Sequence, residues 1–359
     1  MNRITLIILL LAGINIFLSS CLKDEPFKTD FQSFEPSSVN DGWELSNPEN
    51  EKIDRKKLEQ AYKLVYSDNR YLRAQSLLIF RNGKLVAEAY PNNPKDIEAI
   101  YNIQSCTKSI TSIMTGIAVE DGKISSLDEK LYSIYPECFD SDVNKHSISI
   151  NDALTMQAGL EFDNESQTLD LYETTTGSAE YVLAQKRLST SGTFMNYNDG
   201  APHLVSKAIE KKTGKSLNKY AEEKLFTPLG ITNWKWEQAK DGTTFGAFSL
   251  FLKPRDFGKI GQLLLQNGRW NNQSIIDSTY LTDATSTKVF ANYNSEPYGY
   301  YFWIFPGFKG YAARGHGGQF LLVVPEKKLV VVYTAWPYTS GDFFDNDSEL
   351  MQLIVDSCN

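Results

Sequence analysis

Residues 105–114 read Ser-Cys-Thr-Lys-Ser-Ile-Thr-Ser-Ile-Met, at the start of a run with helical apolar spacing. Ser105 and Lys108 are three residues apart, so a helix places the hydroxyl and the amine on one face. A serine hydroxyl is a weak nucleophile and needs a base to accept its proton. Lysine can be that base when it is partly neutral, and we expect burial and the positive end of the helix dipole to disfavour its ammonium form.

This spacing alone is not specific, because about one match by chance is expected in a chain of this length. A second copy occurs at Ser216-Leu217-Asn218-Lys219, where we expect a surface turn with a helix cap. A helix cap with a solvated lysine is also the alternative for Ser105 and Lys108. The sequence around the two copies distinguishes them.

Two later blocks accompany the first copy. Residues 192–199 read Gly-Thr-Phe-Met-Asn-Tyr-Asn-Asp and precede a helical pattern through 204–210. Residues 314–319 read Arg-Gly-His-Gly-Gly-Gln and lead into an apolar, strand-like run. In this order, the three blocks resemble the class C β-lactamase-related serine hydrolases. That family includes β-lactamases, D-amino-acid peptidases, esterases and 6-aminohexanoate-dimer hydrolases, and the resemblance covers residues 43 to 359.

The resemblance implies an α+β, β-lactamase/transpeptidase-like fold, in which helices flank an antiparallel sheet and a mostly helical subdomain is inserted. The sequence pattern agrees, because strand-like runs occur at both ends of the chain and helical spacing in the middle. We expect the α/β part at about 43–104 and 290–359 and the helical part at about 105–289. Strands are predicted at 76–81, 84–90, 300–305, 319–324 and 329–335, and further helices at 54–65 and 348–355. Asn82-Gly83 between the first two strands is a strong hairpin signal.

The roles of the site residues follow from the same resemblance. Ser105 is expected to be the acylated nucleophile and Lys108 its base. Tyr197 matches the tyrosine that passes protons to the leaving group and from the deacylating water. His316 is expected on the strand beside the nucleophile, where other members have lysine or histidine.

The resemblance also implies an oxyanion hole and a substrate-binding edge. The backbone N–H groups of Ser105 and Gln319 would form the oxyanion hole, and losing one such donor typically costs about 3 kcal/mol of barrier. Gly318 would let a substrate lie close to the strand edge. Asp199 is a candidate substrate-binding residue, with a loop or helix cap as the alternative.

Two departures from the family pattern bear on the substrate. The tyrosine motif usually ends in asparagine, but here it ends in Asp199, and an ionised carboxylate can only accept hydrogen bonds. His316 replaces a lysine that would hold a substrate carboxylate. Both changes favour a small, uncharged ester or amide as substrate. A β-lactamase or D-alanyl peptidase acting on peptidoglycan, and a non-catalytic member that binds cell-wall fragments or a partner, remain open.

The N-terminus has the pattern of a lipoprotein signal. An apolar run from Ile4 to Leu18 suits the core of a signal peptide over residues 1–20, and Leu18-Ser19-Ser20-Cys21 resembles the bacterial lipobox. We therefore expect Cys21 to be lipidated, residues 21–42 to form a flexible tether, and the membrane contact to be through the lipid anchor only. The predicted location is the cell envelope, at the outer membrane, on its periplasmic or its outer side.

The composition excludes several function classes. The 359 residues are 42% hydrophobic and 22% charged, with a net charge of −8, so nucleic acid is not an expected partner. The three histidines show no metal-binding spacing, and neither a metal nor an organic cofactor is expected.

Besides Cys21, the chain has Cys106, Cys138 and Cys358, which allow at most one disulfide. Whether Cys138 and Cys358 form it stays open, and Cys106 is expected to be a small buried hydrophobe.

Overall fold

The structure is a computed structural model that describes residues 30–336 and 347–359. The predicted signal peptide at 1–20 and the lipidated Cys21 lie outside the described residues, so they stay predictions. In the part of the chain that is described, no helix is both long enough and apolar enough to cross a membrane.

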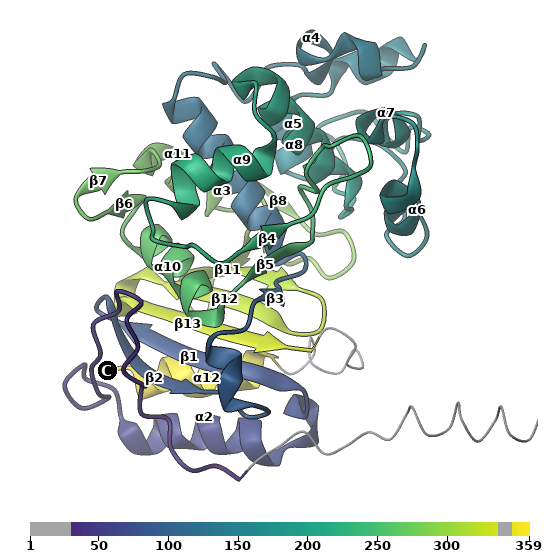
Figure 1. Ribbon diagram of the computed structural model, residues 1–359. Helices are drawn as coiled ribbons and strands as arrows, with labels where there is room; N and C mark the ends of the chain where they lie inside the picture. Colours follow the sequence, from purple (N-terminus) through teal and green to yellow (C-terminus); the bar gives the residue numbers. More distant parts are fainter. Residues whose placement is uncertain (1–29, 337–346) are drawn as a thin grey trace, which may run out of the picture.

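The centre of the molecule is an antiparallel sheet of eight strands in the order β2-β1-β13-β12-β11-β10-β9-β8 (Figure 1). The strands are β1 (Ala74–Arg81), β2 (Lys84–Ala89), β8 (Val289–Phe290), β9 (Pro297–Tyr298), β10 (Trp303–Phe305), β11 (Gly310–Gly315), β12 (Gln319–Val324) and β13 (Leu329–Ala335). The predicted hairpin is confirmed, and Asn82 and Gly83 form its turn with positive φ angles of 53° and 85°. The strand predicted at 300–305 begins only at Trp303, and β11 was not predicted because its Gly-Tyr-Ala-Ala-Arg-Gly sequence lacks β-branched residues.

Two helices from opposite ends of the chain cover one face of this sheet, α2 (Arg55–Ser67) and α12 (Asp347–Ser357) (Figure 1). The Asp54 side chain caps α2 by accepting from the backbone N–H groups of Lys56 and Lys57. The apolar residues of α2 at helical spacing are fully buried, and the hydroxyl of Tyr62 donates to the carbonyl of Leu77 in β1. The helix predicted at 54–65 is thus confirmed.

The opposite face of the sheet carries the helical region that contains the site (Figure 1). Its helices are α3 (Cys106–Glu120), α4 (Leu131–Ile134), α5 (Ile150–Leu154), α6 (Gln167–Glu173), α7 (Ser178–Leu183), α8 (Gly200–Thr213), α9 (Leu217–Ala221), α10 (Pro254–Leu265) and α11 (Ser278–Ala284). It also holds a three-stranded sheet of β3 (Tyr101–Asn102), β5 (Leu250–Leu252) and β4 (Lys235–Trp236), and a hairpin of β6 (Arg269–Trp270) and β7 (Gln273–Ser274). Every residue of α3 from Cys106 to Ala118 is buried, so this helix is the core of the region.

Helix α10 does not follow the predicted division into two parts. It lies within the segment 105–289 expected to form the helical subdomain, yet it packs directly on the large sheet. The approach is so close that a Cβ at Gly258 would be 2.4 Å from the ring of Phe80, and one at Gly261 would be 2.4 Å from Val330. The sheet layer therefore includes a helix from the middle of the chain.

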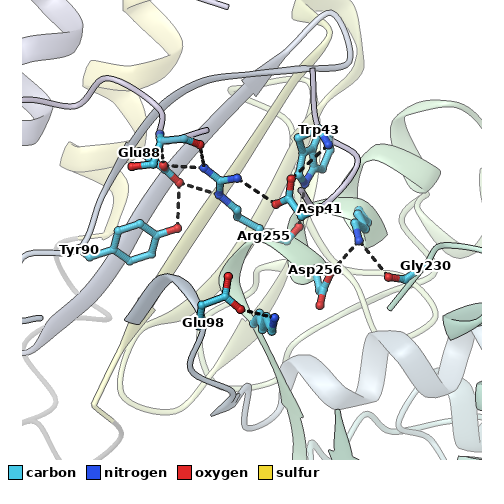
Figure 2. Close-up of polar contacts among 11 residues, drawn as sticks. Asp41, Trp43, Glu88, Tyr90, Glu98, Gly230, Arg255 and Asp256 are labelled. Carbon is cyan, nitrogen blue, oxygen red and sulfur yellow. Dashed lines mark hydrogen bonds and ion pairs between the residues drawn. The ribbon is translucent and has the colours of Figure 1, made fainter. Parts of the chain in front are cut away.

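The segment before α2 is not a free tether over its described part, which corrects the expectation for residues 30–42. Phe34 is only 3% exposed, and its carbonyl accepts from the backbone N–H of Glu88 at 2.8 Å. Asp41 forms an ion pair of 2.9 Å with Arg255 (Figure 2). The carbonyl of Ser37 accepts from the same guanidinium at 2.7 Å. Isolated anchoring residues in a stretch without periodicity leave no pattern, so this packing could not be predicted from the residues alone.

The described cysteines Cys106, Cys138 and Cys358 are all buried free thiols. The Cys138–Cys358 bridge that the sequence left open is therefore not formed. Burial raises the pKa of the Cys106 thiol, despite the nearby positive charge of Lys108, so the thiol next to Ser105 stays protonated.

Candidate active site

Ser105 and Lys108 stand at the N-terminal end of α3. Gln104, just before the serine, has a positive φ of 50°, and its backbone N–H donates to the Asn102 side chain at 2.8 Å. This turn fixes the direction in which the chain enters the helix. Ser105 is half-buried, whereas Lys108 is only 1% exposed. The Nζ of Lys108 donates to the Oγ of Ser105 at 2.8 Å, so the structure brings the two side chains together.

The Lys108 ammonium has two other partners. It donates to Oδ1 of Asp199 at 2.6 Å and to the carbonyl of Ala247 at 3.2 Å. An ammonium has three N–H donors, so these contacts and that to Ser105 match its full capacity. Lys108 is therefore held in one position, with one N–H directed at the serine oxygen.

The charge state of Lys108 differs from the sequence expectation. Burial lowers its pKa, as expected, but the negative charge of Asp199, the nearby phenol of Tyr197 and the hydrogen bond to Asp199 together outweigh burial and raise the pKa above its ordinary value. The expectation of a lowered pKa is thus wrong. The reason is the carboxylate 2.6 Å away, which lies 91 residues along the chain.

Asp199 is fixed by two other residues. Its second oxygen, Oδ2, accepts from the hydroxyl of Thr168 in α6 at 2.7 Å, and its backbone N–H donates to the side chain of Asn164 at 2.8 Å. It immediately precedes α8, but its side chain makes no capping hydrogen bond there. Both carboxylate oxygens are engaged within the protein, so in this arrangement Asp199 positions Lys108 rather than reaching toward a substrate. Its predicted substrate-binding role stays a prediction.

Tyr197 reaches the same place from the loop before α8. The Nζ of Lys108 lies 5.0 Å from the centroid of its ring. The ring packs against Tyr298 and Trp303, with centroid separations of 6.1 Å and 5.7 Å. The structure thus gathers the hydroxyl, amine and phenol that the sequence motifs singled out.

The His-Gly-Gly block lies in the turn between β11 and β12, not on a strand, which corrects the predicted placement of His316. His316 is exposed. Gly317 and Gly318 have φ angles of 75° and 95°, a left-handed conformation that favours glycine. At the end of β11, Gly315 lies so close to the start of α3 that a Cβ on it would be 2.6 Å from the carbonyl of Ile103. This turn is therefore held beside the nucleophile.

Gln319, the first residue of β12, lies against the start of α3. Its carbonyl accepts a hydrogen bond from the Sγ of Cys106 at 3.4 Å. The buried side chain is used structurally, because its amide donates to the carbonyl of Ala335 in β13. Only the backbone of Gln319 is left to act in the site, consistent with the backbone role that the resemblance implies.

Sequence reasoning missed several members of this constellation. Ala247 contributes a backbone carbonyl, which no residue type signals, and Asn164 and Thr168 lie in a part of the helical region without a motif. Trp303 belongs to no motif either; it is buried, and it packs against the ring of Tyr197. Over residues 30–336 and 347–359, no group of three or more His, Cys, Asp or Glu side chains is placed to hold a metal ion.

Comparisons with known proteins bear on the family and the fold. The family model described as "Beta-lactamase" matches residues 67–354. "Beta-lactamase-like protein 2" of Dictyostelium discoideum is 25% identical over 283 residues, which are 68% of this chain and 51% of that protein, so the chain spans about half the length of this curated relative.

Two solved structures share the architecture. One is a protein from Bacillus anthracis provisionally described as a 6-aminohexanoate-dimer hydrolase, with a TM-score of 0.74 and 20% identity, over 92% of this chain and 91% of that one. The other is a family VIII carboxylesterase, with a TM-score of 0.68 and 15% identity, over 85% and 97% of the two chains. At these identities the likeness shows the fold, which is β-lactamase/transpeptidase-like. The family match extends across most of the chain, which therefore belongs to the β-lactamase family, whose members are serine hydrolases.

Proposed function

We propose that this protein hydrolyses a small, uncharged ester or amide through an acyl-enzyme formed on Ser105. The observation that carries the proposal is the 2.8 Å contact between Lys108 Nζ and Ser105 Oγ at the start of a buried helix. The Tyr197 ring beside the same amine supports it. So do structural neighbours described as a carboxylesterase and, provisionally, as a 6-aminohexanoate-dimer hydrolase.

The residues present can perform both halves of such a reaction. In acylation, Ser105 Oγ forms a bond to the substrate carbonyl carbon while its proton passes to Lys108 in its neutral form, which the raised pKa makes the minor form at neutral pH. The bond to the leaving group then breaks, and Tyr197 gives that group a proton and regains one from Lys108. In deacylation a water attacks the acyl carbon, its proton returns by the same groups, and the carboxylic acid leaves Ser105 free. The backbone N–H groups of Ser105 and Gln319 would stabilise the negative oxygen in each half.

The residues around this constellation favour a substrate without a carboxylate. The turn beside the nucleophile carries His316 instead of a permanent cation, and Asp199 adds a negative charge next to Lys108. A β-lactam or a peptide C-terminus would bring a second negative charge toward this carboxylate. A β-lactamase or peptidase activity is therefore the less favoured enzyme reading.

A comparison of substrates tests this assignment. We expect p-nitrophenyl butyrate to be hydrolysed with a kcat/KM at least about 100-fold above that of nitrocefin, equivalent to about 2.7 kcal/mol of barrier. Both rates are measured by absorbance with the same enzyme preparation. Faster turnover of nitrocefin, or stable labelling by a fluorescent penicillin, would instead support the β-lactamase or peptidase alternative. No burst and no turnover with any ester or amide would support the non-catalytic one.

The Asp199→Asn variant tests the control of Lys108. The neutral amine accepts the proton in acylation, and Asp199 raises the pKa of that amine. Without the carboxylate, burial is expected to dominate and the pKa of Lys108 to fall, so the neutral form is present at lower pH. The acidic limb of the kcat/KM pH profile should therefore move to lower pH.

The matched control for this variant is Asp170→Asn, which removes an exposed carboxylate of α6 and should leave the limb in place. If Asp199→Asn left the limb unmoved or moved it to higher pH, Lys108 would not be the base. Loss of activity at every pH would show that Asp199 is required for more than setting the pKa of Lys108.

A further inference from the structure

A cavity of about 960 Å³ lies away from the proposed catalytic residues, none of which lines it. It is bounded by the β1–β2 turn at Gly83, by the outward side of α10, by the β6–β7 hairpin and by the segment around Trp43. Its size is at the upper end of the range of small-molecule binding sites. It is therefore large enough to hold a ligand of several rings.

The lining combines two indole rings with a concentration of side-chain amides. Trp43 and Trp270 supply the rings. The amides are Gln262 of α10, Gln266 and Asn267 just after that helix, and the two asparagines of the β6–β7 turn. Each amide can both donate and accept, which matches hydroxyl groups, since these also do both. Most ligand sites are chiefly apolar with few polar groups, so this lining is suited to a polyol.

Trp43 is held in place before any ligand binds. Its indole N–H donates to the carbonyl of Arg255 at 3.2 Å (Figure 2), and its ring packs on Phe80 with a centroid separation of 4.3 Å. The ring is only partly buried. A fixed aromatic surface costs little ordering entropy when a ligand stacks on it.

Gln262 has an unmet hydrogen-bonding capacity at this cavity. The residue is 5% exposed, and its Oε1 is buried without a hydrogen-bond partner. Leaving a buried acceptor unsatisfied costs about 1–3 kcal/mol, so such groups in native proteins usually have a function or a bound partner. A half-turn of the terminal amide exchanges its oxygen and nitrogen, and this would present the acceptor to the cavity and to a ligand hydroxyl.

The charges of the lining do not favour an ion. Two acidic residues, Asp41 and Glu44, and two basic ones, Lys259 and Arg269, give no net formal charge. Asp41 pairs with Arg255 at 2.9 Å, Glu44 with Lys84 at 2.7 Å and Lys259 with Asp256 at 2.8 Å. These three charges are thus paired within the protein, and the fourth, the guanidinium of Arg269, donates to the carbonyl of Asn272 at 2.6 Å.

We propose that this cavity binds a short, uncharged oligosaccharide. The apolar faces of its sugar rings stack on Trp43 and Trp270, and its hydroxyls pair with the amides, one of them with Oε1 of Gln262. This binding is separate from ester or amide hydrolysis and does not depend on it.

Isothermal titration with tri-N-acetylchitotriose and with maltotriose tests the proposal on the protein that comprises residues 30–359. At least one of the two is expected to bind, and Trp270→Ala should weaken that binding by about ten-fold or more. Gln262→Met should also weaken saccharide binding. The Tm of this variant without ligand should stay within about 3 °C of the parent, because Oε1 of Gln262 makes no hydrogen bond within the protein that could be lost. Ester turnover should be unchanged in both variants.

The matched control is Trp234→Ala, which removes an indole that packs on Phe226 outside the cavity and should leave saccharide binding intact. The proposal is overturned if neither trisaccharide binds at 10-millimolar concentrations, or if binding survives Trp270→Ala unchanged. Tighter binding of an anionic oligogalacturonate than of either neutral sugar would contradict the assignment of an uncharged ligand.

Discussion

Replacing Ser105 with alanine is expected to lower kcat/KM for p-nitrophenyl butyrate by about 10⁴-fold or more, since removing the nucleophile of a serine hydrolase abolishes covalent catalysis. The remaining groups, Lys108 and Tyr197, have no proton to take from an alanine. The variant should fold normally, because the Ser105 side chain makes no capping hydrogen bond to α3. Steady-state kinetics and a thermal melt on the same sample measure the two effects separately.

A second serine in the chain provides a matched control. Ser216 and Lys219 have the same spacing at the start of α9, but Lys219 is exposed and pairs with Glu222 at 3.1 Å. Ser216→Ala should therefore keep full activity. If Ser105→Ala kept the parent's rate with every substrate found, the acyl-enzyme on Ser105 would be excluded.

Replacing Arg255 with leucine is expected to destabilise the protein by about 3–5 kcal/mol, because it leaves a carboxylate buried without its partner. Arg255 is only 2% exposed. Its guanidinium makes two hydrogen bonds to Glu88, at 2.9 Å and 2.7 Å, and also binds Asp41 (Figure 2). A further hydrogen bond goes to the carbonyl of Ser37. Burial opposes the charge of Arg255, but hydrogen bonds to Glu88 raise its pKa overall. Urea denaturation measures the loss as a change in the free energy of unfolding.

Two variants separate this network from a general loss of charge. Lys253→Leu breaks an ion pair with the exposed Glu98 and should cost less than about 1 kcal/mol. Adding Glu88→Leu to Arg255→Leu removes the uncompensated carboxylate and should restore part of the stability. A loss below 1 kcal/mol for Arg255→Leu alone would show that the network does not anchor the segment before α2.

The strands with strong local signals could be predicted from the sequence. The Asn82-Gly83 turn, the apolar run at 319–324 and the valine-rich run at 329–335 carry the strand information in their own residues. The residues of β11 carry no such signal, and neither does the packing of α10 on the sheet. Gly258 and Gly261 of α10 reveal a close contact only once Phe80 and Val330 are placed against them. Contacts between distant segments are not encoded in local periodicity.

The same distinction applies to the site. Motifs identified Ser105, Lys108 and Tyr197, because the chemistry requires those side-chain types, and the fold brings them together. The charge state of Lys108 could not be predicted, since it depends on Asp199, which reaches the amine from the start of α8. A pKa is set by neighbours in space, and here the decisive neighbour comes from another element.

The most direct test of the central claim is to trap the acyl-enzyme position chemically. A fluorophosphonate forms a bond from phosphorus to an activated serine oxygen and releases fluoride, and tandem mass spectrometry of the tryptic peptide 96–108 locates the added mass. The structure predicts one label per chain, on Ser105, and none in Ser105→Ala. A label on another residue, or equal labelling of Ser105→Ala, would contradict it.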